Sequence, residues 1–386
     1  MGGMIPATAP WANRPDLIAL AERLQARFVG GAVRDMLLGL AVADIDLATP
    51  LSPETVIERV RDAGFKPVPT GIAHGTITAV LPEGPVEVTT LRRDVSTDGR
   101  HAVVAFTDDW REDAARRDFT MNALYADPAT GELFDYFGGL DDLKAGRVRF
   151  IGDPLQRIAE DHLRILRFFR FHARFGHAID EAGLAACAAR ANDLMALSRE
   201  RIAAELLKLL VAVRAVPVVT LMVEQGIFRA VLPEIDAAGV ERLARLAERE
   251  AATGVAPDAI RRLAALLPPG AAEPVGARLK LSNTDRKRLI AATAGPGDEG
   301  PRALAYRMGL VSAIDRLLLA GESIAPIRDW TPPALPLTGG ALVERGIGKG
   351  PDVARLLRRI ESQWIAEGFP DAARVNQIAD AVVAQA

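Results

Sequence analysis

The sequence predicts an α+β fold, with strands and helices in its first part and helices alone in the remainder. A short apolar run ends in the pair Gly30-Gly31 and precedes a segment of helical character, and later apolar stretches form a predicted hairpin. From Glu181 onward the chain is rich in Ala, Leu and Arg at helical spacing. Strands gathered in one region and helices in another are typical of this fold class.

The composition indicates a globular protein with several domains. The chain has 386 residues, of which 49% are hydrophobic and 25% are charged, and its only cysteine is Cys187. One cysteine excludes an internal disulfide and a multi-cysteine zinc site. Because no apolar run reaches membrane-spanning length and the first residues lack the pattern of a secretion signal, we expect a cytoplasmic protein with no membrane partner. The net charge of −3 leaves a nucleic-acid partner open, since local clusters of Arg and Lys decide such binding.

The stretch from Phe28 to Thr49 combines two features of a magnesium-dependent phosphoryl-transfer site. A strand, a glycine pair and a helix start present free backbone N–H groups to an anion. Asp44 and Asp46 alternate with apolar residues in the next predicted strand, so both carboxylates are expected to project to one side. Mg²⁺ prefers such oxygen ligands, completed by water and substrate phosphates. Either motif alone is common in unrelated proteins, but their close spacing favours the functional interpretation.

The next elements are a helix and a hairpin. Ser52-Pro53 has helix-start chemistry, and this helix is expected to stop at Gly64. Strand-like segments follow at residues 65–68, 76–81 and 86–90, with a turn at residues 82–85.

Glu87 is a candidate third carboxylate of this site. It lies between Val86 and Val88, so its side chain points away from the face that they bury. An exposed strand position is the ordinary interpretation. If this strand lies beside the Asp44–Asp46 strand in a mixed sheet, Glu87 would complete a carboxylate cluster that holds metal or accepts a proton.

Two charged segments follow the hairpin. Residues 92–106 begin with a polar run that lacks periodicity, which predicts a mobile loop carrying positive charge near the site. The segment after it has two interpretations. One is a helix with ion pairs Glu112–Arg116 and Asp113–Arg117; the other is an Arg aimed at a triphosphate and an Asp aimed at a ribose hydroxyl.

A predicted strand over residues 146–153 leads into a long helix. Asp153-Pro154 has cap chemistry, and the helix is expected to run to Phe175. A solvated charged stripe is one interpretation of its polar residues, and a binding surface is the other. Four charged residues recur at a spacing of three, so that neighbours share a side of the helix: Asp161, Arg164, Arg167 and Arg170.

These motifs together resemble the class II CCA-adding enzymes, which belong to the tRNA nucleotidyltransferase and poly(A) polymerase family of the polymerase-β-like nucleotidyltransferase superfamily. The motifs occur in the family's order over roughly residues 27–210 and are specific in combination. They are Gly-Gly-Ala-Val-Arg-Asp at 30–35, Asp-Ile-Asp at 44–46, Arg-Arg-Asp-Phe-Thr-Met-Asn-Ala at 116–123, Arg-Phe-Ile-Gly-Asp-Pro at 149–154, Glu-Asp-x-x-Arg at 160–164 and Ser-x-Glu-Arg-Ile at 198–202.

The resemblance implies a template-independent enzyme that adds the 3′-terminal CCA to tRNA from CTP and ATP with Mg²⁺ and releases pyrophosphate. It also implies that the polar start of the 92–106 segment is the flexible loop of enzymes that finish with A. The tRNA would lie along the helical part of the chain. The implied domains are a nucleotidyltransferase head over residues 1–145, a nucleobase-recognising neck over 146–212, a body over 213–295 and a tRNA-binding tail over 296–386.

The resemblance also implies roles for individual residues. Asp44 and Asp46 would hold two Mg²⁺ ions and Glu87 would be the third catalytic carboxylate. The remaining implied residues bind the nucleotide: Gly30, Gly31, Arg34 and Arg117 at the triphosphate, Asp118 at the ribose, Asp161 and Arg164 at the base, and Arg167 and Arg170 supporting that pair or contacting phosphate.

Asp161 and Arg164 have the chemistry to select bases without a template. Cytosine and adenine both present an exocyclic amine beside an unprotonated ring nitrogen. A carboxylate accepts from the amine and a guanidinium donates to the ring nitrogen, whereas uracil and guanine reverse this pattern.

Two alternatives stay open at this point. A poly(A) polymerase or an enzyme that adds only A to tRNA would share the motifs of the head. A non-catalytic RNA-binding relative is the second alternative, although the Asp44 and Asp46 carboxylates would have no use near RNA phosphates.

Overall fold

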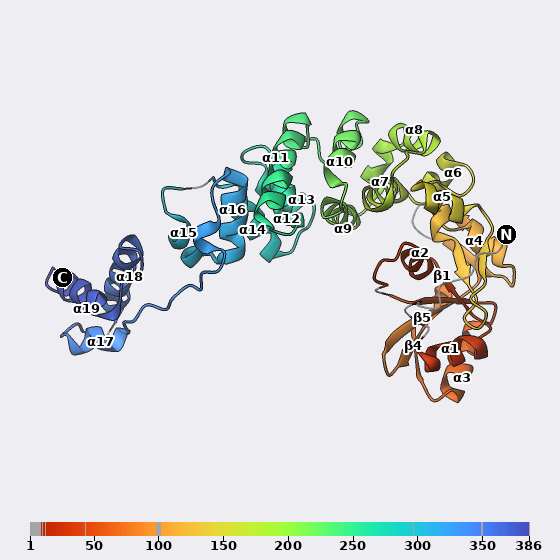
Figure 1. The fold of residues 1–386 in the computed structure, drawn as a ribbon, viewed down its shortest axis with the longest axis horizontal. Coiled ribbons are helices and arrows are strands. Elements are labelled where there is room, and N and C mark those ends of the chain that lie inside the picture. The colour runs from red at the N-terminus through yellow and green to blue at the C-terminus, as the bar shows by residue number, and fades with distance from the viewer. Residues whose placement is uncertain are drawn as a thin grey trace. The chain divides into compact units, whose positions relative to one another are not determined.

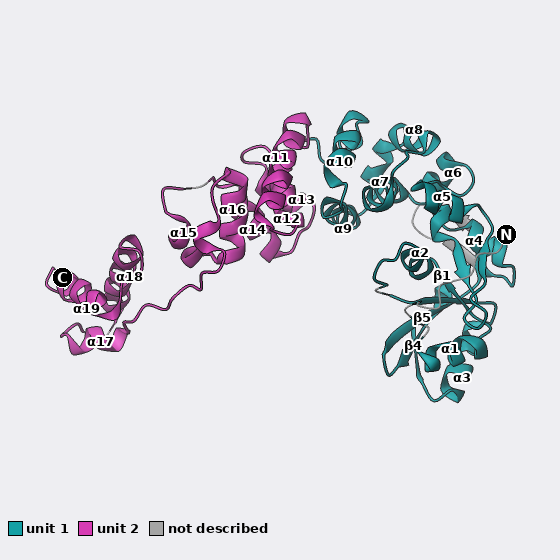
Figure 2. Ribbon diagram, viewed as in Figure 1, with its two compact units in different colours: residues 1–233 teal, residues 234–386 magenta. Residues whose placement is uncertain are grey.

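The computed structural model describes residues 9, 11, 13–42, 44–97, 102–295, 297–348 and 350–385. The chain divides into two compact units, residues 1–233 and residues 234–386 (Figure 2). Figure 1 shows that the strands precede α5 (Gly139–Ala145) and that only helices follow it in the described part of the chain. The predicted fold class is therefore confirmed, and the limits of the four predicted domains stay predictions.

A mixed sheet forms the centre of the first unit. Its strand order is β3-β4-β5-β2-β1-β8-β9, and β2 and β5 are parallel while the other neighbours are antiparallel. The predicted hairpin is the β4–β5 pair. The seven strands are β1 (Arg27–Val29), β2 (Asp46–Thr49), β3 (Lys66–Gly71), β4 (Thr76–Leu81), β5 (Gly84–Thr90), β8 (Leu124–Ala126) and β9 (Leu133–Asp135).

The register of the sheet separates a buried face from the face that carries the carboxylates. Ile77, Val88, Leu47 and Phe28 are paired across four neighbouring strands, and none of them is exposed. Trp11 stacks on Phe28 with the ring centroids 4.2 Å apart, which covers this face. Because successive side chains of a strand point to opposite faces, the next row of residues projects to the other side of the sheet.

The helices of the first unit begin and end where local chemistry indicates. Ser52 caps α3 by accepting from the backbone N–H of Thr55, as its sequence predicted, and α3 packs on β3, β4 and β5. The helices of this unit are α1 (Pro15–Arg23), α2 (Gly31–Leu37), α3 (Pro53–Asp62), α4 (Trp110–Ala115), α5, α6 (Pro154–Glu160), α7 (Arg164–Phe175), α8 (Glu181–Ala189), α9 (Arg199–Leu210) and α10 (Ala215–Glu224), with 3-10 turns η1 (Ile72–His74), η2 (Thr120–Asn122) and η3 (Ala191–Ala196).

The predicted helix from Pro154 to Phe175 is wrong as a single element. It is interrupted at Asp161, whose backbone is extended with φ −150° and ψ 105°. The Asp161 carboxylate accepts from the backbone N–H of Leu163, a local bond that competes with continuing the helix. The strand predicted over residues 146–153 is also absent from the described structure, which has only two isolated bridges there, from Phe150 to Phe119 and from Arg147 to Ala178.

The irregular loop predicted over residues 92–106 is wrong for the described part of that segment. β6 (Arg92–Thr97) and β7 (Ala102–Phe106) pair as a separate two-stranded antiparallel sheet. The pairing has an irregular register between Asp94 and Ser96, which explains why regular alternation is missing from the sequence. Residues 98–101 lie outside the described residues.

Aromatic rings join α7 to the segment that precedes η2. Phe119 lies 4.8 Å from Phe150 and 5.5 Å from Phe171, measured between ring centroids, and Phe150 stacks on Phe168 at 5.6 Å. Such packed rings fix the α7 backbone against the head. The polar residues of α7 therefore have defined positions above the sheet.

The second unit is helical in its described residues. No helix in the described residues has the length and hydrophobicity needed to cross a membrane. Its helices are α11 (Ala237–Thr253), α12 (Ala259–Leu266), α13 (Ala272–Arg278), α14 (Asn283–Thr293), α15 (Pro301–Met308), α16 (Leu310–Ala320), α17 (Gly339–Glu344), α18 (Pro351–Ala366) and α19 (Ala372–Val383), with the 3-10 turn η4 (Ala325–Ile327).

A buried ion network ties four helices of the second unit together. Asp315 of α16 accepts from Arg288 of α14 over 2.6 Å and lies 3.2 Å from Arg261 of α12. Arg261 also lies 3.2 Å from Glu250 of α11, which pairs with Arg262 over 2.8 Å. Glu250 and Asp315 are 2% and 1% exposed, so removing one member leaves buried charge uncompensated.

Replacing Asp315 by alanine is expected to lower the free energy of unfolding by about 3 kcal/mol, because Arg288 and Arg261 lose a buried partner. Urea unfolding of the purified variant measures this loss. The matched control is Asp352→Ala, which removes an exposed ion pair to Arg355 in the same unit and should cost less than about 1 kcal/mol. Equal losses in the two variants would contradict the structural role of the network.

Candidate active site

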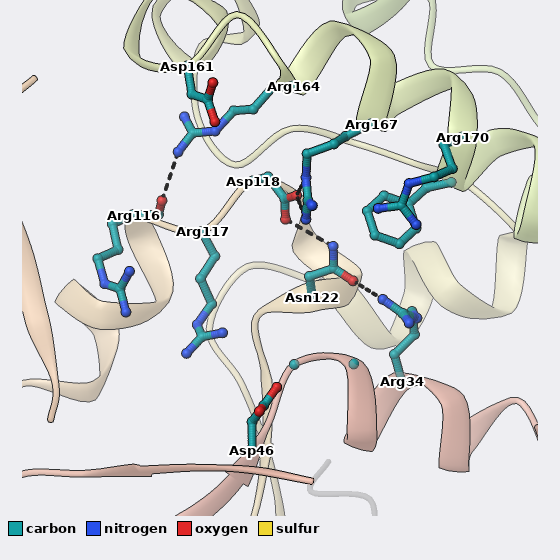
Figure 3. Close-up of a pocket in the computed structure, with 13 residues that line it drawn as sticks. Arg34, Asp46, Arg116, Arg117, Asp118, Asn122, Asp161, Arg164, Arg167 and Arg170 are labelled. Atoms are coloured by element: carbon teal, nitrogen blue, oxygen red, sulfur yellow. Dashed lines mark hydrogen bonds and ion pairs between the residues drawn. The ribbon is translucent and has the colours of Figure 1, made fainter. Parts of the chain in front are cut away.

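A polar cavity of about 500 Å³ lies between the sheet and α7 (Figure 3). It brings together ten of the twelve site residues predicted from the sequence, and Asp44 and Glu87 are not on its wall. The wall consists of Gly30, Gly31, Arg34, Asp46, Arg116, Arg117, Asp118, Asn122, Asp161, Arg164, Arg167, Arg170 and Phe171.

Asp46 and Glu87 are neighbours on the face of the sheet opposite the buried row. Asp46 is the first residue of β2, and the parallel register pairs it directly with Glu87 of β5. The expected proximity of these strands is thus correct. Asp44 precedes β2 and is exposed, so the expectation that both aspartates sit within one strand is wrong. In the described register the backbone pairs with β5 from Asp46 onward and with β1 from Leu47 onward.

The charges around Asp46 fit a divalent cation. Burial raises the pKa of the Asp46 carboxyl, Glu87 and Asp44 raise it further, and Arg117 opposes them. An excess of negative charge in a partly buried wall is relieved when a cation binds there. Mg²⁺ is commonly held by one or two carboxylates together with substrate phosphates. Among the described residues no group of three or more His, Cys, Asp or Glu side chains is arranged to hold a metal alone.

Gly30 allows an arginine to approach the glycine turn. Its φ is +70°, and a Cβ there would lie 3.3 Å from Nη1 of Arg117. A residue with a side chain would be strained in this conformation and would crowd the guanidinium. The turn and Arg117 therefore face one another across the cavity end that also contains Asp46 and Arg34 (Figure 3).

Asp113 holds both arginines of the Arg-Arg-Asp motif. It lies 2.7 Å from Arg116 and 3.1 Å from Arg117, and it accepts from the hydroxyl of Tyr125 over 2.7 Å. The predicted pair Asp113–Arg117 is confirmed, whereas Glu112 accepts from Thr107 and Arg116 pairs with Asp113 instead. The interpretation as a helix with ion pairs is thus partly right, whereas contact of an arginine with a triphosphate and of an aspartate with a ribose stays a prediction, although these residues line the cavity.

Replacing Asp113 by asparagine is expected to lower the free energy of unfolding at neutral pH by about 2 kcal/mol. Burial alone would raise the pKa of Asp113, but Arg117 and Arg116 hold it at about 2, below its ordinary 3.8. The stabilisation is complete above the ordinary pKa and is lost as the pH falls through about 2. Unfolding free energies measured from neutral to acidic pH should therefore fall for the natural chain and change less for the variant; parallel curves would contradict this.

Asp118 is held between α7 and η2. Its Oδ2 accepts from Nε of Arg167 over 2.7 Å, and its Oδ1 accepts from the Asn122 amide over 2.9 Å. Burial alone would raise the pKa of Asp118, but the charge of Arg167 and these hydrogen bonds lower it. The residue is an ionised hydrogen-bond acceptor on the cavity wall, as reading a ribose hydroxyl requires.

Asp161 and Arg164 both line the cavity but do not pair with each other. Asp161 accepts from Nη2 of Arg201 of α9 over 2.9 Å. Arg164 donates to Glu160 over 2.6 Å. Figure 3 shows its second hydrogen bond, to the Arg116 backbone carbonyl over 3.2 Å. The carboxylate and the guanidinium are thus held by separate partners, and both line the cavity.

Arg167 and Arg170 do not support the Asp161–Arg164 pair directly. Arg167 binds Asp118, and Arg170 binds Glu205 of α9 with its guanidinium carbon 4.1 Å from the centroid of the Phe171 ring. Instead of supporting the Asp161–Arg164 pair, each of these two arginines is therefore bound by its own acidic residue. Phosphate contact by either arginine stays a prediction.

Three wall residues were not among the predicted site residues: Arg116, Asn122 and Phe171. Arg116 and Asn122 lie inside the motif at residues 116–123, so its full length could have indicated them. Phe171 gives no such signal, because an aromatic residue at helical spacing usually belongs to a core. Here its ring lies between 4.1 and 5.3 Å from the guanidinium carbons of Arg34, Arg167 and Arg170.

Two known protein families match this chain, one over the head and the other over helices that follow it. The family described as "Poly A polymerase head domain" matches residues 26–149, and "Probable RNA and SrmB- binding site of polymerase A" matches residues 176–238. The protein named "CCA tRNA nucleotidyltransferase 1, mitochondrial" of Mus musculus is 36% identical over 381 residues, covering 90% of this chain and 84% of its own. A "CCA-adding enzyme" of Staphylococcus saprophyticus is 41% identical over 191 residues, covering 49% of this chain and 47% of its own.

A solved structure agrees with these matches. The crystal structure of the Bacillus stearothermophilus CCA-adding enzyme in complex with CTP superposes with a TM-score of 0.67 at 27% identity, over 92% of this chain and 94% of that one. The resemblance inferred from the motifs is thereby confirmed. Because 36% of residues are identical to the murine enzyme over most of both chains, this chain belongs to the family of CCA-adding tRNA nucleotidyltransferases.

Proposed function

We propose that this chain adds C, C and A to the 3′ end of tRNA, using CTP and ATP and releasing pyrophosphate. The observation that carries the proposal is the single cavity whose wall combines Asp46 with Arg117 at one end and Asp161 with Arg164 at the other. The first pair has the chemistry for a metal-bound triphosphate, and the second has the chemistry for the shared edge of cytosine and adenine. The names of the mammalian and bacterial relatives support the same activity.

The residues of the carboxylate end would hold Mg²⁺. Asp46 and Asp44 are the proposed ligands, and Glu87 beside Asp46 is the proposed third carboxylate. Bound Mg²⁺ supplies Lewis-acid chemistry that activates the RNA 3′-hydroxyl and neutralises the leaving pyrophosphate. Gly30 and Gly31 leave room for the triphosphate, and Arg34 and Arg117 supply positive charge beside it.

The other wall residues would orient the nucleoside. Asp118 would accept from a ribose hydroxyl, while Asp161 accepts from the base amine and Arg164 donates to the ring nitrogen. A nucleotide bound this way has its α-phosphate near Asp46 and its base near α7. Fixing the reacting groups in one geometry is itself a large part of catalysis.

Glu87→Gln is expected to lower the rate of nucleotide addition about tenfold, because it removes a negative charge beside Asp46 but leaves Asp46 in place. Single-turnover addition of CTP to tRNA lacking its CCA end measures the change. Glu83→Gln, at the exposed β4–β5 turn, is the matched control and should leave the rate unchanged. A Glu87→Gln variant that adds nucleotides at the natural rate would show that the Glu87 carboxylate takes no part in the reaction.

One experiment tests the proposed function and separates it from its alternatives. Purified protein is incubated with tRNA lacking CCA, Mg²⁺, and CTP or ATP singly and together, and the products are resolved by length. Addition of C, C and then A supports the proposal. Addition of A alone or of a long A tract would select an A-adding enzyme or a poly(A) polymerase, and no addition would select a non-catalytic relative.

The cytoplasmic location expected from the sequence remains a proposal. The first relatives in mammals are named as mitochondrial proteins. Fractionation of cells that produce the tagged full chain tests the location directly.

A further inference from the structure

Asn122 lies between two functional regions of the cavity wall and contacts both. It ends η2, is 7% exposed, and its amide makes two side-chain hydrogen bonds (Figure 3). Nδ2 donates to Oδ1 of Asp118 over 2.9 Å, and Oδ1 accepts from Nη1 of Arg34 over 2.5 Å. Because a carboxylate only accepts and a guanidinium only donates, these partners fix which way the amide points.

Asp118 is held from three sides and still lies on the cavity wall. Its Oδ1 accepts from Asn122 and from the backbone N–H of Phe119 over 2.8 Å. Its Oδ2 accepts from Nε of Arg167 over 2.7 Å and lies 2.5 Å from Nη2 of the same guanidinium. These four contacts fix the orientation of the carboxylate, and a sugar hydroxyl that reaches it would share an oxygen with one of these donors.

Arg34 is fixed from several directions. Its Nε donates to Asp35 over 2.8 Å, its guanidinium carbon lies 4.8 Å from the centroid of the Phe175 ring, and it is 5% exposed. Asp35 in turn lies 3.2 Å from Arg174 of α7. The Asn122 amide therefore joins two charged groups that are each held in place by other contacts.

We propose that Asn122 is a positioning residue, which ties the sugar-reading carboxylate of Asp118 to the triphosphate-contacting guanidinium of Arg34 and so sets the preference for ribonucleotides over 2′-deoxyribonucleotides. The inference rests on the proposed function, because Asp118 and Arg34 receive their substrate roles there. Only a side chain with a donor and an acceptor on opposite sides satisfies both partners. A carboxylate at position 122 would repel Asp118, and an aliphatic side chain would satisfy neither partner.

Base selection provides an internal control. Asp161 is held by Arg201, and Arg164 is held by Glu160, so neither base-reading side chain depends on Asn122 in the structure. A change at Asn122 should therefore alter discrimination between sugars and leave discrimination between bases intact.

The test compares the natural chain with Asn122→Ala, Asn122→Asp and the exposed control Asn192→Ala. Single-turnover rate and affinity are measured for CTP, 2′-deoxy-CTP and UTP on tRNA lacking CCA, under mildly alkaline conditions that keep an introduced carboxylate ionised. Both Asn122 variants are expected to lose about ten- to a hundredfold in the CTP to 2′-deoxy-CTP ratio, the size of one lost hydrogen bond to a charged group. The CTP to UTP ratio should stay within about twofold.

Each outcome separates the positioning role from its alternatives. If the natural chain adds no CTP, the proposed function fails and the inference falls with it. If the natural chain prefers CTP and the Asn122 variants keep the same sugar ratio, the positioning role alone is overturned. If both ratios fall together in Asn122→Ala and Asn122→Asp, the residue is merely structural, which also overturns the proposal.

Discussion

Replacing Asp46 by asparagine is expected to lower the rate of nucleotide addition by about a thousandfold or more and to leave tRNA affinity nearly unchanged. Of the three proposed catalytic carboxylates, Asp46 is the one that lines the cavity, and burial, followed by the charges of Glu87 and Asp44, raises its pKa. The amide keeps the shape of the side chain but removes its charge. The loss should therefore appear in the rate of addition, because Asp46 would help to hold the Mg²⁺ that neutralises the charge of the leaving pyrophosphate.

Rate and binding must be measured separately to test this expectation. Single-turnover addition of CTP gives the rate, and filter binding of labelled tRNA gives the affinity. Asp62→Asn, an exposed change at the end of α3, is the matched control for loss of a carboxylate in the same unit. A variant that binds tRNA poorly, or one that keeps the natural rate, would contradict the proposed role of Asp46.

The parts of the fold set by neighbouring residues were predictable from the sequence. Ser52 caps α3 through Thr55, three residues away, and the β4–β5 hairpin follows from the turn between its strands. The interruption at Asp161 was not predictable in this way. Its carboxylate accepts from the backbone N–H of Leu163, two residues on, but it is also held by Arg201, which lies forty positions along the chain on another helix. A local pattern of helical spacing contains no trace of that partner.

The same distinction applies to the candidate site. The motifs named the residues of the cavity wall because each motif is a continuous stretch with its own chemistry. The hydrogen-bond partners of these residues could be identified only from the tertiary structure. Arg167, for example, binds Asp118, which lies 49 positions earlier in the sequence. The pairing of Asp46 with Glu87 depends likewise on the parallel register of β2 and β5. The sequence thus shows which residue types are present, whereas the geometry that gives them their roles comes from the tertiary structure.

Replacing Arg164 by alanine is expected to reduce the preference for CTP over UTP about a hundredfold. In the structure Arg164 is held by Glu160 and by backbone carbonyls of Arg157 and Arg116, so its guanidinium has a defined place at the base end of the cavity. A base with an unprotonated ring nitrogen accepts from this group, and uracil presents an N–H there instead. Without the guanidinium, only the Asp161 carboxylate still penalises the wrong base.

Competition between CTP and UTP for the same tRNA measures this preference. Arg190→Ala is the matched control, because Arg190 pairs with Asp193 outside the cavity wall. The sugar ratio of CTP to 2′-deoxy-CTP should remain natural in Arg164→Ala, since Asp118 and Asn122 do not contact Arg164 through any described hydrogen bond. An Arg164→Ala variant that still rejects UTP would show that the base is read by other groups. A variant that loses the sugar ratio as well would show that the two ends of the cavity are not independent, which would contradict the separate roles assigned to Arg164 and Asn122.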